Sequence, residues 1–253
     1  MTKPLLYFSY GMTKSGSTLA FQIVRHMFEA SGFTQLLAPK ESGRVGNKIN
    51  AFDDIEQPQL DLLCAFAKAN GPLVIKTHQR PSQAIQKLLK SGLAWAHATY
   101  RDPRDIVLSM LDHGHRARAK GEKPFAEIVD IDTALESVRF QTENLRQWLN
   151  MSNVLPIDYE ELAFETKAVI HALSTQIGIA KLPPDLIARA QSEFTQKNKA
   201  IQNRHRSEMD ANNSTKIVKE FSPFISKLIT NKQTLPPYPK AALTEIDQLR
   251  IGA

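Results

Sequence analysis

Hydrophobic positions along the chain alternate between short apolar runs and stretches with helical spacing. Residues 4–10, PLLYFSY, form a short apolar and aromatic run that ends at a glycine, which is typical of a buried strand. From Ser17 to Gly32 the apolar residues recur on one helical face, at Leu19, Ile23, Val24, Met27 and Phe28. The pattern therefore predicts a strand, a glycine-containing loop and a helix at the start of the chain.

The same alternation continues through the rest of the chain. Further buried strands are predicted at three apolar runs, residues 72–78, 93–100 and 153–159. Helices are predicted at 57–70, 81–91, from 103 onward, at roughly 130–149 and up to about 194. Two stretches without either period are predicted to be irregular, 39–54 and 113–124. Because strands alternate with helices, we expect one α/β domain over residues 1–253, a three-layer, doubly wound parallel sheet with helices on both faces.

Composition narrows the class of protein. The chain has 253 residues and a mass of 28.4 kDa, with 42% hydrophobic and 23% charged residues, as in ordinary globular proteins. Its one cysteine, Cys64, excludes an internal disulfide framework. The first apolar run is too short for a signal peptide or a membrane span, so we expect a reducing, cytoplasmic location and no membrane partner.

The charge balance is basic, with a formal net charge of +6 and a sequence pI of about 9.3. Charge alone is compatible with nucleic acid or with a small polyanionic ligand. Lysine and arginine are scattered along the chain and form no run or stripe, so no nucleic-acid partner is expected.

The first loop comes close to a known phosphate-binding pattern. The segment YGMTKSGSTL matches G-x-x-x-x-G-K-[ST] at Gly11, Gly16 and Thr18, but Ser17 stands at the position of the pattern's lysine. A lysine lies two residues before the second glycine, as Lys14. A glycine loop that opens a helix binds anions, because its N–H groups point inward and the helix N-terminus carries partial positive charge. A plain glycine turn with a solvated lysine is the alternative.

A second candidate lies at the carboxyl end of the second strand, in IKTH. Side chains alternate along a strand, so Lys76 and His78 share one face and Thr77 points away. Open α/β sheets bind ligands at this edge, where a histidine is suited to act as a general base near neutral pH. The neighbouring lysine should lower the pKa of His78. A surface pair without a function is the alternative.

A third candidate is the segment YRDPRDIVLS. Arg101 ends a strand, and Asp102 is predicted to cap the following helix, with Asp105 as a first-turn charge. Ser109 lies seven residues beyond the cap, about two helical turns, which returns it to nearly the same face. The arginine fork and the serine hydroxyl are therefore expected to share one phosphate group.

Taken in order, TKSGST, KTH and YRDPRDIVLS resemble the sulfotransferases that use 3′-phosphoadenosine 5′-phosphosulfate (PAPS). In that family a P-K-S-G-T-T loop holds the 5′-phosphosulfate, and K-T-H supplies the catalytic base. An arginine, followed eight residues later by a serine, holds the 3′-phosphate, and a Y-E-D-L/M tyrosine lies by the adenine; DYEEL, residues 158–162, resembles that stretch. The resemblance implies a P-loop NTPase-like fold and transfer of the sulfuryl group to a hydroxyl or amine of a small-molecule acceptor, with 3′-phosphoadenosine 5′-phosphate (PAP) as product.

The resemblance also implies a role for each matching residue. His78 would take the acceptor proton, while Lys14 and Lys76 would stabilise charge on the moving group and on the bridging oxygen. The implied cofactor-binding residues are Lys14, Ser15, Gly16, Ser17, Thr18, Arg101, Ser109 and Tyr159. No metal is expected, because the lysines supply the positive charge that Mg²⁺ supplies in phosphoryl transfer.

The chain departs from the family's pattern in three places. Leu19 stands where the family often has a tryptophan that packs on the adenine. The late R-K-G motif, which closes over the 3′-phosphate, has no clean match. The nearest segment is NRHRSE, residues 203–208, a polar stretch expected to be mobile, in which Arg204 and Arg206 are the candidates for this role. The family's dimer motif is also missing, so the oligomeric state is open.

Two other interpretations stay open on the sequence alone. VLPID looks like a Walker B element, so an ATP-dependent small-molecule kinase would use Asp158 and Thr18 as magnesium ligands. A nucleotide-binding protein without catalysis is the other. His113 and His115 have no carboxylate or cysteine partner in their motif, so no metal site is expected there. Their segment is expected to be a surface loop near the acceptor.

Overall fold

The computed structural model describes residues 4–45, 47–179, 181–193 and 201–234. The chain divides into two compact units, Met1–Met209 and Asp210–Ala253, and each is described by itself. In the second unit, helix α10 (Ala211–Thr234) contains Pro223 in its interior. The expectation of one domain over residues 1–253 stays a prediction. None of the described helices is long and apolar enough to cross a membrane.

The described part of the first unit is built on a five-stranded sheet in the order β2-β3-β1-β4-β5, in which all pairings are parallel. Its strands are β1 (Leu6–Gly11), β2 (Ala51–Phe52), β3 (Leu73–Thr77), β4 (Ala94–Tyr100) and β5 (Val154–Asp158). The four strands expected from apolar runs are present. The fifth, β2, lies in a stretch expected to be a loop, because a strand of two residues is too short to show a period.

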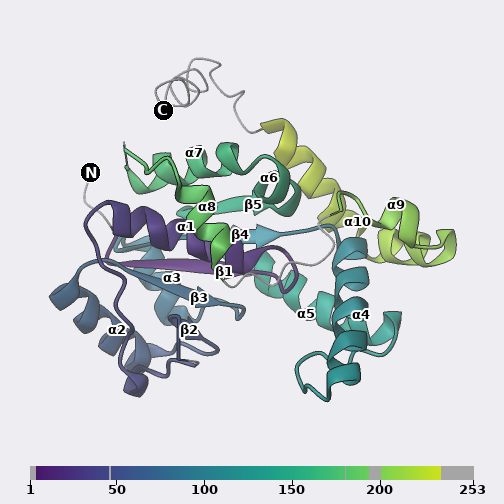
Figure 1. Ribbon diagram of the computed structural model, residues 1–253, viewed down its shortest axis with the longest axis horizontal. Coiled ribbons are helices and arrows are strands. Elements are labelled where there is room, and N and C mark those ends of the chain that lie inside the picture. Colours follow the sequence, from purple (N-terminus) through teal and green to yellow (C-terminus); the bar gives the residue numbers. More distant parts are fainter. Residues whose placement is uncertain (1–3, 46, 180, 194–200, 235–253) are drawn as a thin grey trace. The chain divides into compact units, whose positions relative to one another are not determined.

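Helices cover both faces of the sheet, as the doubly wound pattern predicts (Figure 1). Helices α1, α7 and α8 lie on one face, and α2, α3 and α5 lie on the other. Their bounds are α1 (Ser17–Ala30), α2 (Gln57–Asn70), α3 (Gln83–Lys90), α4 (Pro103–Lys120), α5 (Ile131–Leu149), α6 (Tyr159–Phe164), α7 (Thr166–Ile177), α8 (Leu186–Ser192) and α9 (His205–Glu208). The expected three-layer α/β fold is therefore confirmed.

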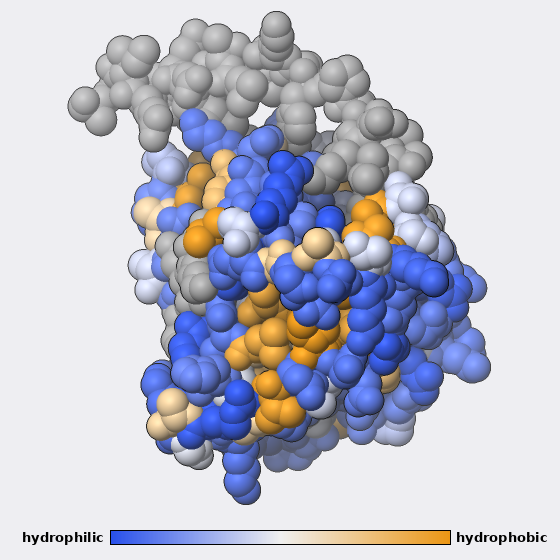
Figure 2. Space-filling view, turned by 90° about the vertical axis from the view of Figure 1, so that its right-hand side faces the viewer, coloured by the Kyte–Doolittle hydropathy of each residue, from blue (hydrophilic) through white to orange (hydrophobic). Residues whose placement is uncertain are grey.

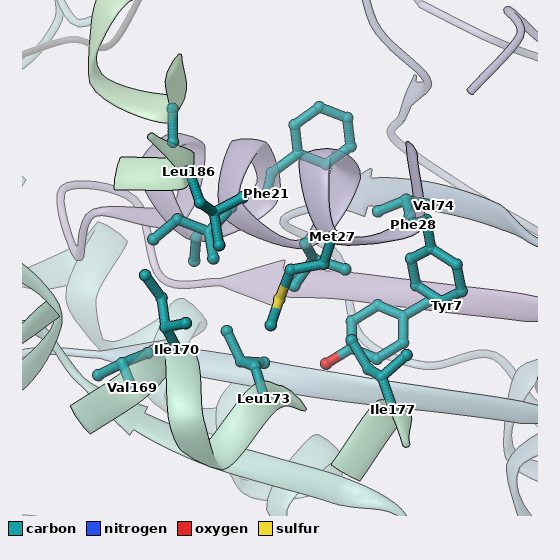
Figure 3. Close-up of a cluster of buried hydrophobic side chains, with 14 of the residues drawn as sticks. Tyr7, Phe21, Met27, Phe28, Val74, Val169, Ile170, Leu173, Ile177 and Leu186 are labelled. Carbon is teal, nitrogen blue, oxygen red and sulfur yellow. The ribbon is translucent and has the colours of Figure 1, made fainter. Parts of the chain in front are cut away.

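The alternation along β1 explains how one central strand serves two hydrophobic layers. Tyr7 points into the cluster formed by α1, α7 and α8, where it meets Phe28 edge-on at 5.8 Å (Figure 3). Its neighbours Phe8 and Tyr10 point to the opposite face and pack against Trp148 of α5, at 5.8 and 5.3 Å between ring centroids. Burial on both faces fixes the end of β1, and with it the position of the following loop.

Two segments expected to be irregular are ordered instead. Helix α4 continues through most of 113–124 and ends at Gly121 in the left-handed conformation, with φ 67°. Its basic residues are good helix formers, and Arg118 donates to the carbonyl oxygen of Ile128 at 2.7 Å. The segment 203–208, expected to be mobile, contains helix α9.

Candidate functional site

The loop between β1 and α1 is shaped by glycine and by one lysine in an unusual conformation. A Cβ on Gly11 would lie 2.1 Å from Thr99 Oγ1, so no larger residue fits there. Lys14 and Gly16 both adopt the left-handed region, with φ 69° and 76°. Ser15 holds the loop from inside, because its hydroxyl donates to the Met12 carbonyl at 2.6 Å and lies 2.8 Å from Thr99 Oγ1. Ser17 and Thr18 lie in the first turn of α1. Backbone N–H groups and hydroxyls of this turn therefore meet at a helix N-terminus, which favours an anion.

The residues of IKTH form the predicted pair. Lys76 Nζ lies 2.7 Å from His78 Nε2, and His78 Nδ1 lies 2.6 Å from the carbonyl oxygen of Gly11. A carbonyl accepts and an ammonium donates, so the proton of the neutral imidazole is on Nδ1 and Nε2 carries the lone pair. Burial, and next to it the charge of Lys76, lowers the pKa of His78 to about 4. The imidazole of His78 is therefore neutral at physiological pH.

Both lysines of the site lie in surroundings that disfavour their charge. Burial lowers the pKa of Lys76 to about 8. Burial also lowers the pKa of Lys14 to about 8, and the positive charges of Arg116 and Arg101 act in the same direction. The Lys14 ammonium lies 3.0 Å from Nδ1 of His113 on α4. A negatively charged ligand at this site would raise the pKa of both lysines again.

Arg101 has unsatisfied hydrogen-bonding capacity at the carboxyl end of β4. The residue is 4% exposed, and its guanidinium lies 3.9 Å from the centre of the Tyr159 ring. Its Nε and Nη2 atoms have no hydrogen-bond partner among the described residues; Nη2 lies 3.6 Å from the Asp105 carboxylate, an ion-pair distance only. Buried donors without partners are costly, so this pair of N–H directions points to a ligand. Ser109, also buried, lies on the helix that follows.

Tyr159 links Arg101 to the loop. A Cβ on Gly16 would lie 3.2 Å from the Tyr159 ring, so the ring packs directly on the loop while the guanidinium covers it. The carboxylate of Asp158 caps α6 by accepting from the backbone N–H of Glu160 at 2.7 Å. The residue that the kinase interpretation needs as a magnesium ligand thus serves as a helix cap.

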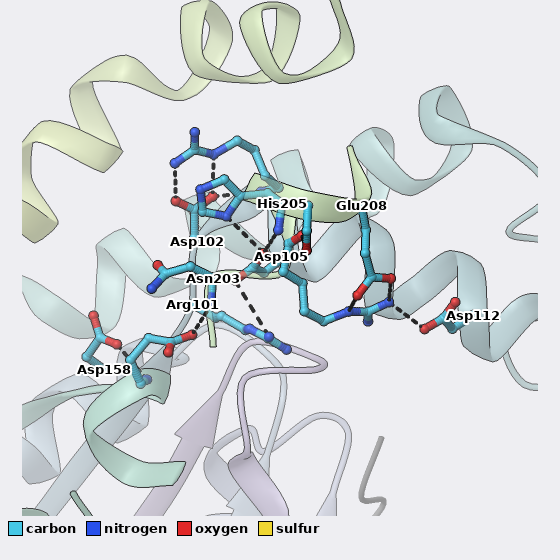
Figure 4. A network of polar contacts seen from close by, with 12 residues as sticks. Arg101, Asp102, Asp105, Asp112, Asp158, Asn203, His205 and Glu208 are labelled. Carbon is cyan, nitrogen blue, oxygen red and sulfur yellow. Dashed lines mark hydrogen bonds and ion pairs between the residues drawn. The ribbon is translucent and has the colours of Figure 1, made fainter. Parts of the chain in front are cut away.

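Asp105 was expected to act only as a charge in the first turn of α4, but it also contacts His205 and Arg101. The residue is fully buried, and one of its oxygens accepts from the backbone N–H of His205 at 2.8 Å and lies 3.0 Å from His205 Nδ1 (Figure 4). Its other oxygen is the one that faces Arg101. A neighbouring contact joins the Asn203 N–H to the carboxylate of Glu160, at 3.5 Å. This network has no signal in the sequence, because Asp105 and His205 are far apart in the chain.

The two arginines of the late segment differ in their surroundings. Arg204 is 2% exposed and donates to Glu208 at 2.7 Å and to Asp112 at 2.8 Å (Figure 4). Arg206 is exposed. The segment is thereby docked on α4, and the 3′-phosphate role expected for both arginines stays a prediction.

Two further residues contact the loop and were not predicted to do so from the sequence. The side chain of Gln141 on α5 accepts a hydrogen bond from the backbone N–H of Thr13, and Nδ1 of His113 accepts one from the Lys14 ammonium. A signal for His113 was present, since it lies four residues after Ser109 and hence on the same side of a continuous helix. Because residues 113–124 were predicted to be irregular, Ser109 and His113 were not recognised as neighbours on one helix.

Comparisons with known proteins agree with this architecture. No curated protein gives a significant match to the chain. Among solved structures, retinol dehydratase in complex with androsterone and PAP is 14% identical, with a TM-score of 0.57 over 88% of this chain and 81% of that chain. Mouse sulfotransferase SULT7A1 in complex with PAP is also 14% identical, with a TM-score of 0.56 over 86% and 83%.

At that identity these structures show the shared P-loop NTPase-like fold. The family itself follows from the sequence, because the model of the sulfotransferase domain matches residues 8–236. The predicted relationship is thus confirmed: the chain belongs to the sulfotransferase domain family, and it is a sulfotransferase.

Proposed function

We propose that this chain transfers the sulfuryl group of PAPS to a hydroxyl or amine of a small-molecule acceptor. The observation that carries the proposal is the buried guanidinium of Arg101, which has two N–H directions without partners among the described residues and lies beside the loop. A 3′-phosphate would satisfy those donors, whereas ATP has only a hydroxyl at that position of the ribose. Family membership supports the same chemistry.

The residues present fit the donor at three points. The N–H groups of the loop, with Ser17 and Thr18, suit the 5′-phosphate, and Arg101 and Ser109 suit the 3′-phosphate. Tyr159 lies between these two places, against the loop on one side and Arg101 on the other. When bound, PAPS would supply an activated sulfuryl group whose S–O bond to the 5′-phosphate breaks during transfer. The ammonium of Lys14 stabilises the negative charge that then develops on the phosphate side.

His78 is the proposed general base. Its Nδ1–H is fixed by the Gly11 carbonyl, which leaves Nε2 as the basic atom and sets the direction of the ring. The acceptor gives its proton to Nε2 as its oxygen or nitrogen bonds to sulfur. Lys76, which donates to Nε2 before the acceptor is in place, must give up that hydrogen bond. Its ammonium is then available to the sulfuryl oxygens.

The acceptor is proposed to be a small molecule with an apolar body. Figure 2 shows one face of the molecule, on which hydrophobic side chains gather within a hydrophilic border. Retinol dehydratase, which shares this fold, has been solved with androsterone and with retinol, both small alcohols with apolar frameworks. The proposal includes the cytoplasmic location expected from the sequence.

Titration calorimetry with PAP tests the cofactor class. The wild-type chain should bind PAP with the same affinity in the presence and absence of Mg²⁺, and far more tightly than AMP, which lacks the 3′-phosphate. Arg101→Ala should lose most of this preference. The matched control is Arg146→Ala, which removes an exposed arginine of α5 that pairs with Glu143. Tight binding of Mg²⁺-ATP that is unaffected by Arg101→Ala would instead support the kinase.

Turnover is tested by incubating the protein with PAPS and a panel of phenols and apolar alcohols, and measuring PAP release. Acceptor-dependent release of PAP supports the transfer reaction. Binding of PAP without release for any acceptor, in wild type and His78→Ala alike, would favour a nucleotide-binding protein without catalysis.

A further inference from the structure

The ammonium of Lys14 is held by an imidazole that belongs to a different element. Lys14 Nζ lies 3.0 Å from Nδ1 of His113. Because an ammonium has no acceptor, Nδ1 must accept, and the proton of the neutral ring is on Nε2. The tautomer is opposite to that of His78, whose Nδ1 carries the proton. The site thus contains two lysine–histidine pairs, and the proposed reaction as described above uses only one of the two histidines.

An aromatic ring packs on the Lys14–His113 pair. The ring of Phe125 lies 4.5 Å from the His113 ring, between centroids, and its centre lies 5.5 Å from Lys14 Nζ. Phe125 adopts the left-handed backbone conformation, with φ 68°. An aromatic residue rarely adopts this conformation, so its surroundings must hold it there.

The sequence of α4 provides those surroundings. A Cβ on Gly114 would lie 2.7 Å from the Phe125 carbonyl oxygen and 2.4 Å from that of Ile128. Only glycine therefore allows the turn 125–128 to approach the helix this closely. Arg118 fixes the same turn by donating to the carbonyl oxygens of Ala126 and Ile128, at 3.0 and 2.7 Å. Gly114 and Arg118 of α4 therefore fix the position of the Phe125 ring beside His113.

We propose that His113 is a positioning residue for Lys14: its Nδ1 fixes the ammonium over the phosphate-binding loop. The inference rests on the proposed function, because it gives Lys14 a role at the donor phosphate. A lysine side chain has many rotamers, and holding its ammonium in one place costs conformational entropy. One N–H of the ammonium goes to His113, and two remain for the ligand.

The charges around Lys14 and His113 explain why a neutral hydrogen-bond acceptor is suited to the position of His113. Arg116 and Arg101 oppose the charge of Lys14, and Asp112 favours it. His113 is surrounded by Lys14, Arg116, Lys120 and Glu122, and burial with the nearby positive charges lowers its pKa. A neutral imidazole accepts a hydrogen bond from the ammonium without cancelling the charge that the phosphate needs. A carboxylate at the same position would form an ion pair and compete with the ligand.

The first test examines the contact in the full chain without ligand. Protein labelled with ¹⁵N at histidine is used to record long-range ¹H–¹⁵N spectra, and the His113 signals are identified with His113→Asn. We expect an unprotonated Nδ1 and a protonated Nε2 for His113, and a change of the Nδ1 shift in Lys14→Ala. The signals of His115, an exposed residue of the same helix, should stay unchanged. The opposite tautomer, or no response to Lys14→Ala, would overturn the inference.

The second test is a double-mutant cycle on PAP binding, measured by calorimetry. Lys14→Ala and His113→Leu should each weaken binding about five- to tenfold, and the double variant should bind no more weakly than Lys14→Ala alone. His113→Asn should recover most of the affinity, because its Oδ1 accepts in place of Nδ1. His115→Leu is the control and should match the wild type.

Three results separate the outcomes of the cycle. Additive losses would mean that His113 acts independently of Lys14, and tighter binding by His113→Leu would mean that it competes with the ligand; either overturns the inference. If the wild-type chain bound no PAP, the proposed function would fail, and the spectra alone would decide whether His113 holds Lys14.

Discussion

Each lysine of the site donates to a neutral imidazole, Lys76 to His78 and Lys14 to His113. This arrangement keeps two positive charges close to where negative charge is expected, while the imidazoles add no charge of their own. Its cost is visible in the lysines, whose pKa values burial lowers to about 8. In the free protein both lysines therefore lose their proton at a much lower pH than an exposed lysine does.

The lowered values predict an alkaline limit to activity. A lysine is charged below its pKa, so kcat/KM, which reports the free protein, should fall as the pH rises through about 8. In kcat the limit should lie at higher pH, because bound anions favour the ammonium form. Initial rates between pH 6 and pH 10, at fixed ionic strength, measure both. A kcat/KM that stays flat to pH 10 would contradict a need for these charges.

The His78→Ala variant separates binding from chemistry. We expect a loss of about 10²-fold or more in kcat, the usual range for a general base, while the affinity for PAP changes less than about twofold. PAP release with a working acceptor and calorimetry with PAP are the two measurements. His115→Ala, on the exposed side of α4, should leave both unchanged. Equal losses in kcat and in PAP affinity would instead assign His78 to donor binding.

His97 makes a separate prediction about stability. The ring is fully buried, with Nε2 2.9 Å from Ser9 Oγ and Nδ1 3.3 Å from the Tyr7 hydroxyl, and burial lowers its pKa to about 3. In the unfolded chain a histidine titrates at about 6.5, so the unfolded state takes up the proton first as the pH falls. Folding stability should therefore fall between pH 6.5 and pH 3.

Urea unfolding at pH 7 and pH 5.5 measures this effect. His97→Gln keeps polar atoms in the cluster but cannot take up the proton, so its stability should depend on pH less than that of the wild type, by about 1 kcal/mol over this interval. His78 contributes to the pH dependence of both proteins and cancels in the comparison. An equal pH dependence in the two proteins would show that His97 is not kept neutral by the fold.

At the scale of the elements, Asp105 connects three parts of the site. It joins the end of β4, through Arg101, to α4 and to α9, through His205. The site therefore depends on contacts between helices as well as on the loop. A buried carboxylate with these partners is costly to lose, because its removal leaves other buried groups unpaired.

Replacement of Asp105 by asparagine should loosen α9. We expect faster amide hydrogen exchange across residues 203–208, and a loss of about 2 kcal/mol in unfolding free energy, since a charged acceptor with two partners becomes a neutral one. Mass spectrometry measures the amide exchange of residues 203–208, and urea unfolding measures the change in unfolding free energy. Asp61→Asn, on the exposed side of α2, is the control. Unchanged exchange in 203–208 would mean that the contact of Arg204 with Asp112 of α4 suffices to hold the segment.

The elements were predictable to different degrees. Strands β1, β3, β4 and β5 follow from apolar runs, because central parallel strands are buried on both faces. Strand β2 gives no such signal. The predicted end of α4 is wrong, because a basic segment does not by itself indicate irregular structure and each of these residues is compatible with a helix.

At the scale of the whole molecule, all the candidate site residues lie in the first compact unit, Met1–Met209. Apart from Arg204 and Arg206, which lie at α9, they come from the carboxyl ends of β1, β3, β4 and β5 and from the helices that follow these strands, the edge at which open α/β sheets bind ligands. Ligand binding should therefore stabilise the fold of this unit as a whole.

Thermal unfolding with and without ligand measures that coupling. PAP at 100 times its dissociation constant should contribute about 2.7 kcal/mol, which for a chain of this size raises Tm by about 5–10 °C. AMP at the same concentration should produce a much smaller shift, and Arg101→Ala should abolish the difference between the two ligands. Equal shifts with PAP and AMP would argue against a 3′-phosphate site at Arg101.

The sequence by itself determined the class of fold and the family, and it singled out the candidate residues of the glycine loop, of KTH and of the Arg101–Ser109 pair. These features are encoded locally, in apolar periods and in spacings along one loop, strand or helix. Only the tertiary structure decided the tautomer of His78, the partner of Lys14, and the contact of Asp105 with His205. Those features depend on atoms that are distant in the chain and are brought together by packing, so no local pattern specifies them.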